Sequence, residues 1–224
     1  MILKKNLSEQ IYEKIKADIL AQRIGFGEKL TNRDLQRTFQ VSSTPIRDAI
    51  NRLYLDGLLE DISNGGARVI AFDLKMALEV NEMMALLNRD AVALTAERGN
   101  QAKVIARLEG IVAQQSRQVE QAAYRRHQSL DKQFHRTFFD YSGNARLARA
   151  YDDNIVLWDT HIAIYFKDYR SIWTRTVEQH RQILSAYQAG DYQMAQELMA
   201  AHFLEAVIPL KELLSQEDAA PAAD

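Results

Sequence analysis

Residues 41–60 read VSSTPIRDAINRLYLDGLLE, and the ten residues before them read TNRDLQRTFQ. Together they predict two short helices joined by a tight turn at Gln40–Val41–Ser42. Thr31 can cap the first helix, because its hydroxyl can accept a hydrogen bond from a free amide of the first turn. The second helix is expected to open at Ser43–Thr44–Pro45, where a hydroxyl cap precedes a proline that needs no amide donor.

The second of these helices has an apolar face and a polar face. The residues expected in the core recur at helical spacing and are Ile46, Ala49, Ile50 and Leu53. The polar face carries Ser43, Thr44, Arg47, Asn51 and Arg52. A short helix with hydroxyls and a guanidinium at its exposed N-terminal end suits the major groove of DNA. On this pattern alone, an ordinary helical hairpin with solvated charges remains an alternative.

The flanking residues predict one more helix and a β-hairpin. Apolar residues step by four from Leu7 to Ile19, which predicts an amphipathic helix from about Ser8 to Gln22. On the other side, residues 61–63 and 67–71 predict two short strands around a turn at residues 64–66. The first domain is therefore expected to be a winged unit spanning residues 1–72.

Length and composition set bounds on the class of protein. A chain of 224 residues is long enough for two domains, and the absence of cysteine fits a reducing cytosol. The first ten residues, MILKKNLSEQ, lack the long apolar core of a signal peptide, and no apolar run approaches 18 residues. We therefore expect a cytoplasmic protein without a membrane segment. The net charge of -2 divides into +2 over residues 1–72 (11 basic, 9 acidic) and -4 over the rest. A weakly basic first part agrees with DNA binding.

The second part of the chain shows helical periodicity with brief interruptions at Gly99–Asn100, Gly143–Asn144 and Gly190–Asp191. The expected helices span 74–98, 102–120, 123–142, 145–167, 171–189 and 192–214. The fold class predicted is mainly α, with an antiparallel six-helix bundle over residues 73–216. Residues 217–224 are acidic and alanine-rich, which predicts a disordered tail.

Four polar residues of this second part could meet inside the bundle. Asp131 and His135 are four apart, so both project from one face of a helix. His180 and His202 each lie beside apolar positions of a later helix. One carboxylate and three imidazoles suit a divalent metal ion. A buried polar network without metal remains the alternative reading of these residues.

The stretch from Val41 resembles the winged helix-turn-helix of the GntR family of bacterial transcription regulators. The matching residues are Val41, Ser42, Thr44, Pro45, Ile46, Arg47, Asp48, Ala49, Leu53, Gly57 and Leu58. The second part is similar to the FCD ligand-binding domain of the FadR-like branch, and its helix count resembles the VanR-type subgroup. The resemblance implies a homodimeric regulator, without enzymatic activity, that binds a near-palindromic operator. We expect a repressor, with an activator as the alternative.

The resemblance also assigns residues to the DNA. Ser43, Thr44 and Arg47 are expected at base edges, while Arg33 and Arg68, with Lys4 and Lys5, are expected at phosphates. Gly66 belongs to the wing. The family often has an arginine where this chain has Ser43, so a bidentate contact to guanine, worth about 1–3 kcal/mol, is absent at that position.

In the FCD domain the resemblance implies one divalent metal ion per chain on Asp131, His135, His180 and His202. Zinc is the first expectation, with nickel, manganese and iron as alternatives. An effector pocket is expected at Met84, Asn88 and His161. Met84 stands where members that bind carboxylate effectors commonly have an arginine, so the effector is not identified. A purely structural metal and a metal-dependent enzyme domain are the competing readings.

Overall fold

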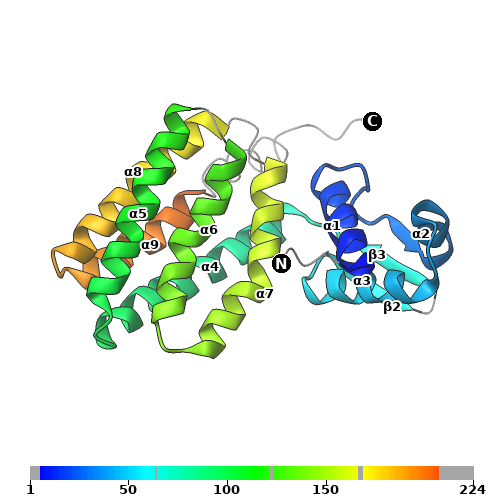
Figure 1. Ribbon diagram of the computed structural model, residues 1–224, viewed down its shortest axis with the longest axis horizontal. Coiled ribbons are helices and arrows are strands. Elements are labelled where there is room, and N and C mark those ends of the chain that lie inside the picture. The colour runs from blue at the N-terminus through cyan, green and yellow to red at the C-terminus, as the bar shows by residue number, and fades with distance from the viewer. Residues whose placement is uncertain (1–5, 64, 122–123, 166–168, 207–224) are drawn as a thin grey trace, which may run out of the picture. The chain divides into compact units, whose positions relative to one another are not determined.

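The computed structural model describes residues 6–63, 65–121, 124–165 and 169–206. Packing divides the chain into two compact units, the first from Met1–Ala77 with Asp153–Tyr165 and the second from Leu78–Asp152 with Phe166–Asp224. Figure 1 shows a small helical part with a sheet in blue and cyan, and a helical bundle in green to orange. The domain boundary expected at residues 72–73 stays a prediction.

Three helices of the first unit form around one apolar core: α1 (Leu7–Leu20), α2 (Asn32–Phe39) and α3 (Ser43–Leu55). The expected core residues of α3 are buried, as are Ile11, Ile15 and Ile19 of α1, and Ile19, Ile46 and Leu53 are fully inaccessible. Leu7, at the start of the predicted apolar stripe of α1, is 48% exposed. The Thr31 hydroxyl accepts from the Asp34 amide, so the predicted cap of α2 is confirmed.

The start of α3 differs from the prediction. Ser42 is its N-cap residue and Ser43 its first helical residue, and no side chain caps the helix. The expected hydroxyl cap at Ser43–Thr44 was therefore wrong. The Ser43 and Thr44 side chains do not bond the helix's own first amides, which leaves them available to an external partner.

The wing is part of a three-stranded antiparallel sheet of order β1-β3-β2, formed by β1 (Lys29–Thr31), β2 (Leu59–Ser63) and β3 (Gly66–Val69). The strand β1 was not predicted, because three residues are too few to show alternation. It pairs with β3 through Leu30 opposite Ala67 and Thr31 opposite Gly66. This third strand gives the hairpin a buried side that two strands alone would lack.

Six further helices in the described part of the chain confirm the predicted helical second part. They are α4 (Leu74–Glu97), α5 (Gln101–Glu120), α6 (Tyr124–Tyr141), α7 (Ala145–Tyr165), α8 (Tyr169–Gln188) and α9 (Tyr192–Ala206). Gly99, Gly143 and Gly190 follow three of these helices with φ values of 72°, 68° and 77°, as helix ends require. The predicted end of the last helix and the tail lie outside the described residues. No helix among those described is long and apolar enough to span a membrane.

Candidate metal centre and nucleic-acid interface

Four residues from three helices meet in the interior of the bundle. Asp131 and His135 come from α6, His180 from α8 and His202 from α9, and each offers one ligand atom within 4.8 Å of the others. All four are buried, from 0% exposed for His180 to 7% for His202. The structure therefore brings together every residue that was predicted as a metal ligand.

Each of the three imidazole rings has one nitrogen close to the Asp131 carboxylate or to a nitrogen of another of these rings. The Nε2 atoms of His135 and His180 lie 3.9 and 3.6 Å from Oδ1 of Asp131. The His180 ring stacks on Phe134, with centroids 3.7 Å apart and planes 5° from parallel. Such stacking restricts rotation of the imidazole and keeps Nε2 directed at the centre.

Burial favours the neutral form of two of these imidazoles, His135 and His202. Loss of solvation holds the pKa of His135 well below its ordinary value, with a smaller contribution from His202. Burial, followed by the positive charge of Arg175, lowers the pKa of His202 to about 4. A neutral imidazole presents a lone pair, which is the form that binds a metal ion.

Two glutamines contact the outer nitrogens of two of the rings. Nδ1 of His180 lies 3.0 Å from Oε1 of Gln115 on α5, and Nδ1 of His202 lies 2.9 Å from Oε1 of Gln179 on α8. Sequence reasoning missed both glutamines. Gln115 continues the buried stripe of Val104, Leu108 and Ile111, so a polar residue at a core position was the available signal.

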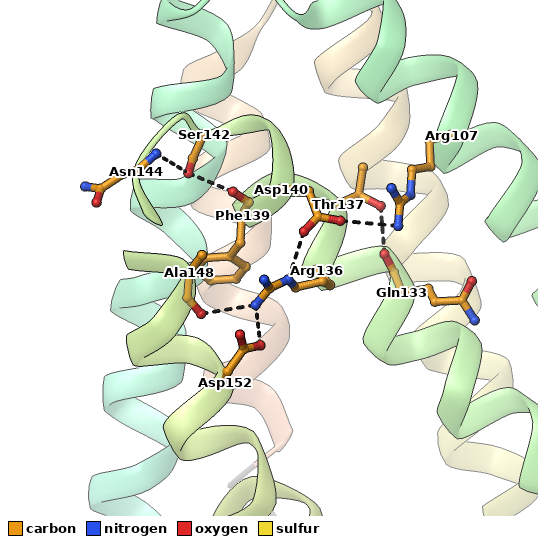
Figure 2. Close-up of polar contacts among 10 residues, drawn as sticks. All are labelled: Arg107, Gln133, Arg136, Thr137, Phe139, Asp140, Ser142, Asn144, Ala148 and Asp152. Atoms are coloured by element: carbon orange, nitrogen blue, oxygen red, sulfur yellow. Dashed lines mark hydrogen bonds and ion pairs between the residues drawn. The ribbon is translucent and has the colours of Figure 1, made fainter. Parts of the chain in front are cut away.

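Arg136, which follows His135 in the sequence, joins α6 to α7 through polar contacts drawn in Figure 2. Nε of Arg136 donates to Asp140 on the same helix at 2.9 Å. Its Nη1 donates to the carbonyl of Ala148 at 3.1 Å and contacts the carboxylate of Asp152, both on α7. Arg107 of α5 pairs with Asp140 at 3.3 Å. These contacts hold Arg136 on the outer side of α6 and resist a rotation that would withdraw Asp131 and His135 from the interior.

The donor set fits a divalent metal ion. Both ring nitrogens of His135 are buried without a hydrogen-bond partner, which costs about 1–3 kcal/mol for such a group unless a ligand satisfies it. Nitrogen and oxygen donors without thiolate suit zinc, nickel, manganese or iron.

On the first unit, the polar face of α3 is open to solvent. Arg33, Thr44 and Arg47 are exposed, and Ser43 is partly exposed. A surface groove joins α3 to the start of α2 and the end of β2, lined by Asn32, Arg47, Ile50, Asn51, Ile62 and Ser63. Arg47 and Asn51 are four residues apart on α3 and share this groove.

The two wing residues have structural contacts as well. Arg68 is exposed, and its guanidinium donates to the carbonyl of Gly27 at 2.7 Å. Gly66 has a φ of 143°, and a Cβ there would lie 1.9 Å from the carbonyl oxygen of Leu30. The close pairing of β3 with β1 therefore requires glycine at residue 66, whether or not the wing contacts DNA. Lys4 and Lys5 lie outside the described residues.

The residues expected in an effector pocket are described in part. Met84 and Asn88 of α4 are fully buried, and Asn88 Nδ2 donates to the carbonyl of Met84 at 2.8 Å. Seven residues earlier, Asn81 Nδ2 donates to the carbonyl of Phe203 at 2.6 Å. The side chain of His161 lies outside the described residues.

The chain joins a winged helix-turn-helix to an all-helical domain, and that domain contains a buried cluster of possible metal ligands. This combination is typical of the class of DNA-binding proteins that respond to a ligand. Residues 7–69 match the family of bacterial regulatory proteins known as the gntR family, and residues 79–205 match the FCD domain. The chain belongs to the GntR family and carries an FCD domain. It is a transcriptional regulator with a DNA-binding domain and an effector-binding domain.

Known proteins similar over nearly the whole chain carry regulator names. An uncharacterized HTH-type transcriptional regulator, YdhC of Bacillus subtilis, is 24% identical over 92% of both chains. A probable D-xylose utilization operon transcriptional repressor of Paenarthrobacter nicotinovorans is 25% identical over 90% of this chain and 87% of its own. The solved structure of E. coli McbR/YncC has a TM-score of 0.69 at 18% identity, over 94% of this chain and all of that one, which shows a shared fold.

Proposed function

We propose that this regulator holds one divalent metal ion on Asp131, His135, His180 and His202, and that a small effector bound beside the ion changes its affinity for an operator. The observation that carries the proposal is the convergence of these four groups within 4.8 Å inside the bundle. A bound ion would attract an oxygen of the effector. The bundle then acts as a sensor and not as a catalyst, and the protein works in the cytoplasm.

The proposed metal is zinc, with nickel, manganese and iron as alternatives. Affinity for nitrogen and oxygen donors rises toward the later metals of the first transition row. One carboxylate and three imidazoles leave positions open on an ion of coordination number above four. An effector oxygen can take such a position, which links occupancy of the site by effector to the packing of α6, α8 and α9.

The DNA-binding side is proposed to work as a homodimeric repressor on a near-palindromic operator. In this reading Ser43, Thr44 and Arg47 contact base edges, and Arg33 and Arg68 contact phosphates. The open N-terminal end of α3 supports the assignment, since its two hydroxyls and Arg47 are not used by the helix itself. Gly66 shapes the wing that accompanies them.

The effector is proposed to carry hydroxyl groups. The amide nitrogens of Asn81 and Asn88 donate to main-chain carbonyls, so each side-chain oxygen must act as an acceptor, and both oxygens are buried without a partner. No lysine or arginine is buried among the described residues, so a carboxylate would have the metal ion as its counter-charge. The relative named for D-xylose utilization agrees with a hydroxylated effector.

Coupling to DNA requires that the effector prefer one arrangement of the dimer over the other. An effector that binds both arrangements equally would shift nothing, however tightly it bound. In the competing reading, in which the metal is purely structural, no effector prefers one arrangement and operator affinity does not respond.

Metal analysis of the purified protein tests the centre, with the double variant Asp131→Ala/His135→Ala as control. We expect about one equivalent of a divalent metal ion in the wild type and none in the double variant. If the wild-type protein binds DNA but takes up neither zinc nor nickel, the four residues form a buried polar network without metal, and the metal centre is refuted.

Operator-binding assays then test the sensor role. We expect a hydroxylated acid such as D-gluconate to change the operator affinity of the metal-loaded protein, whereas hexanoate, which lacks the hydroxyls, should not. Loss of the response in Asn88→Leu would support recognition by that amide. A melting temperature that falls on chelation, together with operator affinity that no such compound changes, would favour the structural metal.

A further inference from the structure

We infer that Gln115 and Gln179 are positioning residues: Gln179 sets the tautomer of His202, and Gln115 accepts the Nδ1 proton of His180, so that both rings turn an Nε2 lone pair to the metal ion. The inference rests on the proposed metal centre. Gln115 lies on α5, which carries none of the four proposed ligands, and Gln179 lies next to His180 on α8. They act through the imidazoles and do not touch the ion.

The contact at His202 can have only one direction. Nε2 of Gln179 donates to Oε2 of Glu205 at 2.8 Å, and a carboxylate can only accept. The amide of Gln179 is therefore oriented with Oε1 toward His202, at 2.9 Å from Nδ1. Because that oxygen can only accept, the proton of the neutral ring must be on Nδ1, and the lone pair is on Nε2.

The orientation of Gln179 is itself held by a short chain of contacts. Glu205 sits three residues after His202 on α9, and its carboxylate pairs with Arg175 on α8. The negative charge of Glu205 polarises the Gln179 amide, which strengthens the hydrogen bond that its oxygen accepts from His202. A stronger acceptor at Nδ1 makes Nε2 a better electron donor toward a metal ion.

The contact at His180 is similar but less constrained. Gln115 is fully buried, its Oε1 lies 3.0 Å from Nδ1 of His180, and its amide nitrogen has no partner. Nothing on that nitrogen holds the amide in one orientation. A metal ion bound at Nε2 would itself place the proton on Nδ1, and Gln115 would then accept it. We therefore expect the loss of Gln115 to weaken metal binding less than the loss of Gln179.

The test measures zinc affinity by competition with a chromophoric chelator, using Gln179→Met and Gln115→Met. Methionine keeps the length of the side chain and removes the acceptor. Controls are Gln182→Met on α8 and Gln114→Met on α5, which are exposed positions of the same helices. We expect Gln179→Met to weaken zinc binding by about 10- to 100-fold, Gln115→Met by less, and the controls not at all.

A second variant and a spectrum separate positioning from helix packing. Gln115→Glu keeps an acceptor for Nδ1 and should retain wild-type zinc affinity or exceed it, even if its metal-free form is less stable. Because the chain has no cysteine, absorption bands of bound Co²⁺ report on nitrogen and oxygen ligands alone, and Gln179→Met should alter them at saturation. A role limited to joining α8 and α9 would leave that spectrum unchanged.

The outcomes distinguish this inference from the proposed function. Wild-type protein that takes up no metal would overturn the metal centre and this inference with it. Wild-type uptake with unchanged zinc affinity and an unchanged Co²⁺ spectrum in both methionine variants would overturn the inference alone.

Discussion

The winged unit and the bundle place their polar side chains in opposite ways. In the winged unit, Arg33, Thr44 and Arg47 stand at the surface, while the core beneath them is apolar. In the bundle, Asp131, His135 and His180 are almost fully inaccessible. A macromolecular partner such as DNA can be met only from outside, whereas an ion or small effector can be enclosed. We therefore expect that a substitution of an exposed polar residue in the winged unit can change DNA binding without changing stability. In the bundle, a substitution of a buried polar residue should change both ligand binding and stability.

Gly66→Ala should give the largest effect, because it alters the core of the winged unit and not its polar surface. The added Cβ would meet the Leu30 carbonyl oxygen at 1.9 Å and strain a φ of 143°. We expect a loss of more than about 3 kcal/mol in the free energy of unfolding, measured by urea titration. DNA binding should fall with it, while metal uptake by the bundle persists.

Gly65→Ala is the matched control, since its Cβ would meet only the Ser63 hydroxyl at 3.7 Å. Equal stability of the two variants would show that the β1–β3 pairing does not require glycine at residue 66.

Arg47→Ala tests the surface side of the comparison. Its exposed guanidinium should contribute to operator binding and little to folding, so specific affinity should fall by about 1–3 kcal/mol per half-site. The measurement is binding to a duplex selected from random sequences by the wild type. Arg23→Ala is the control, because Arg23 is also exposed but pairs with Asp18. Unchanged preference for the selected duplex would refute α3 as the recognition helix.

Acid should destabilise the metal-free bundle, because burial lowers the pKa of His135 and of His202. The pKa of His202 is lowered to about 4, while an unfolded histidine titrates near 6.5, so the unfolded chain binds more protons between these values. Stability should therefore fall as the pH drops through this window, by about 2 kcal/mol at pH 5 for His202 alone. Urea unfolding at pH 7 and pH 5 measures the change.

The variant His202→Gln isolates that contribution, since it removes one titrating group. Its loss of stability between pH 7 and pH 5 should be smaller than that of the wild type. An identical loss would mean that other groups cause the acid sensitivity.

Thr31→Ala should have the smallest effect. The Thr31 hydroxyl accepts from the Asp34 amide at 3.1 Å at the start of α2, and loss of a helix cap costs about 1 kcal/mol. Thermal unfolding of the protein should show this small decrease, and operator affinity should change only through it. A much larger loss of DNA binding than of stability would place Thr31 at the DNA.

Local patterns were sufficient for most of the architecture. Apolar spacing and glycine breaks located the helices of the second part to within a few residues, except for the predicted end of the last helix, which lies outside the described residues. The strand β1 was not predicted because three residues are too few to show an alternating pattern. The cap of α3 was misplaced by one residue because three hydroxyl-bearing residues, Ser42 to Thr44, follow one another.

The sequence by itself determined which residue types were available and on which helices they lay. The spacing of Asp131 and His135 put both on one face, since the period of a helix is a local property. The fold decided that His180 and His202 join them and that Gln115 and Gln179 lie behind two of the rings. It also decided that Gly66 must lack a side chain against Leu30. Such contacts join residues tens of positions apart, and only tertiary packing brings those positions together.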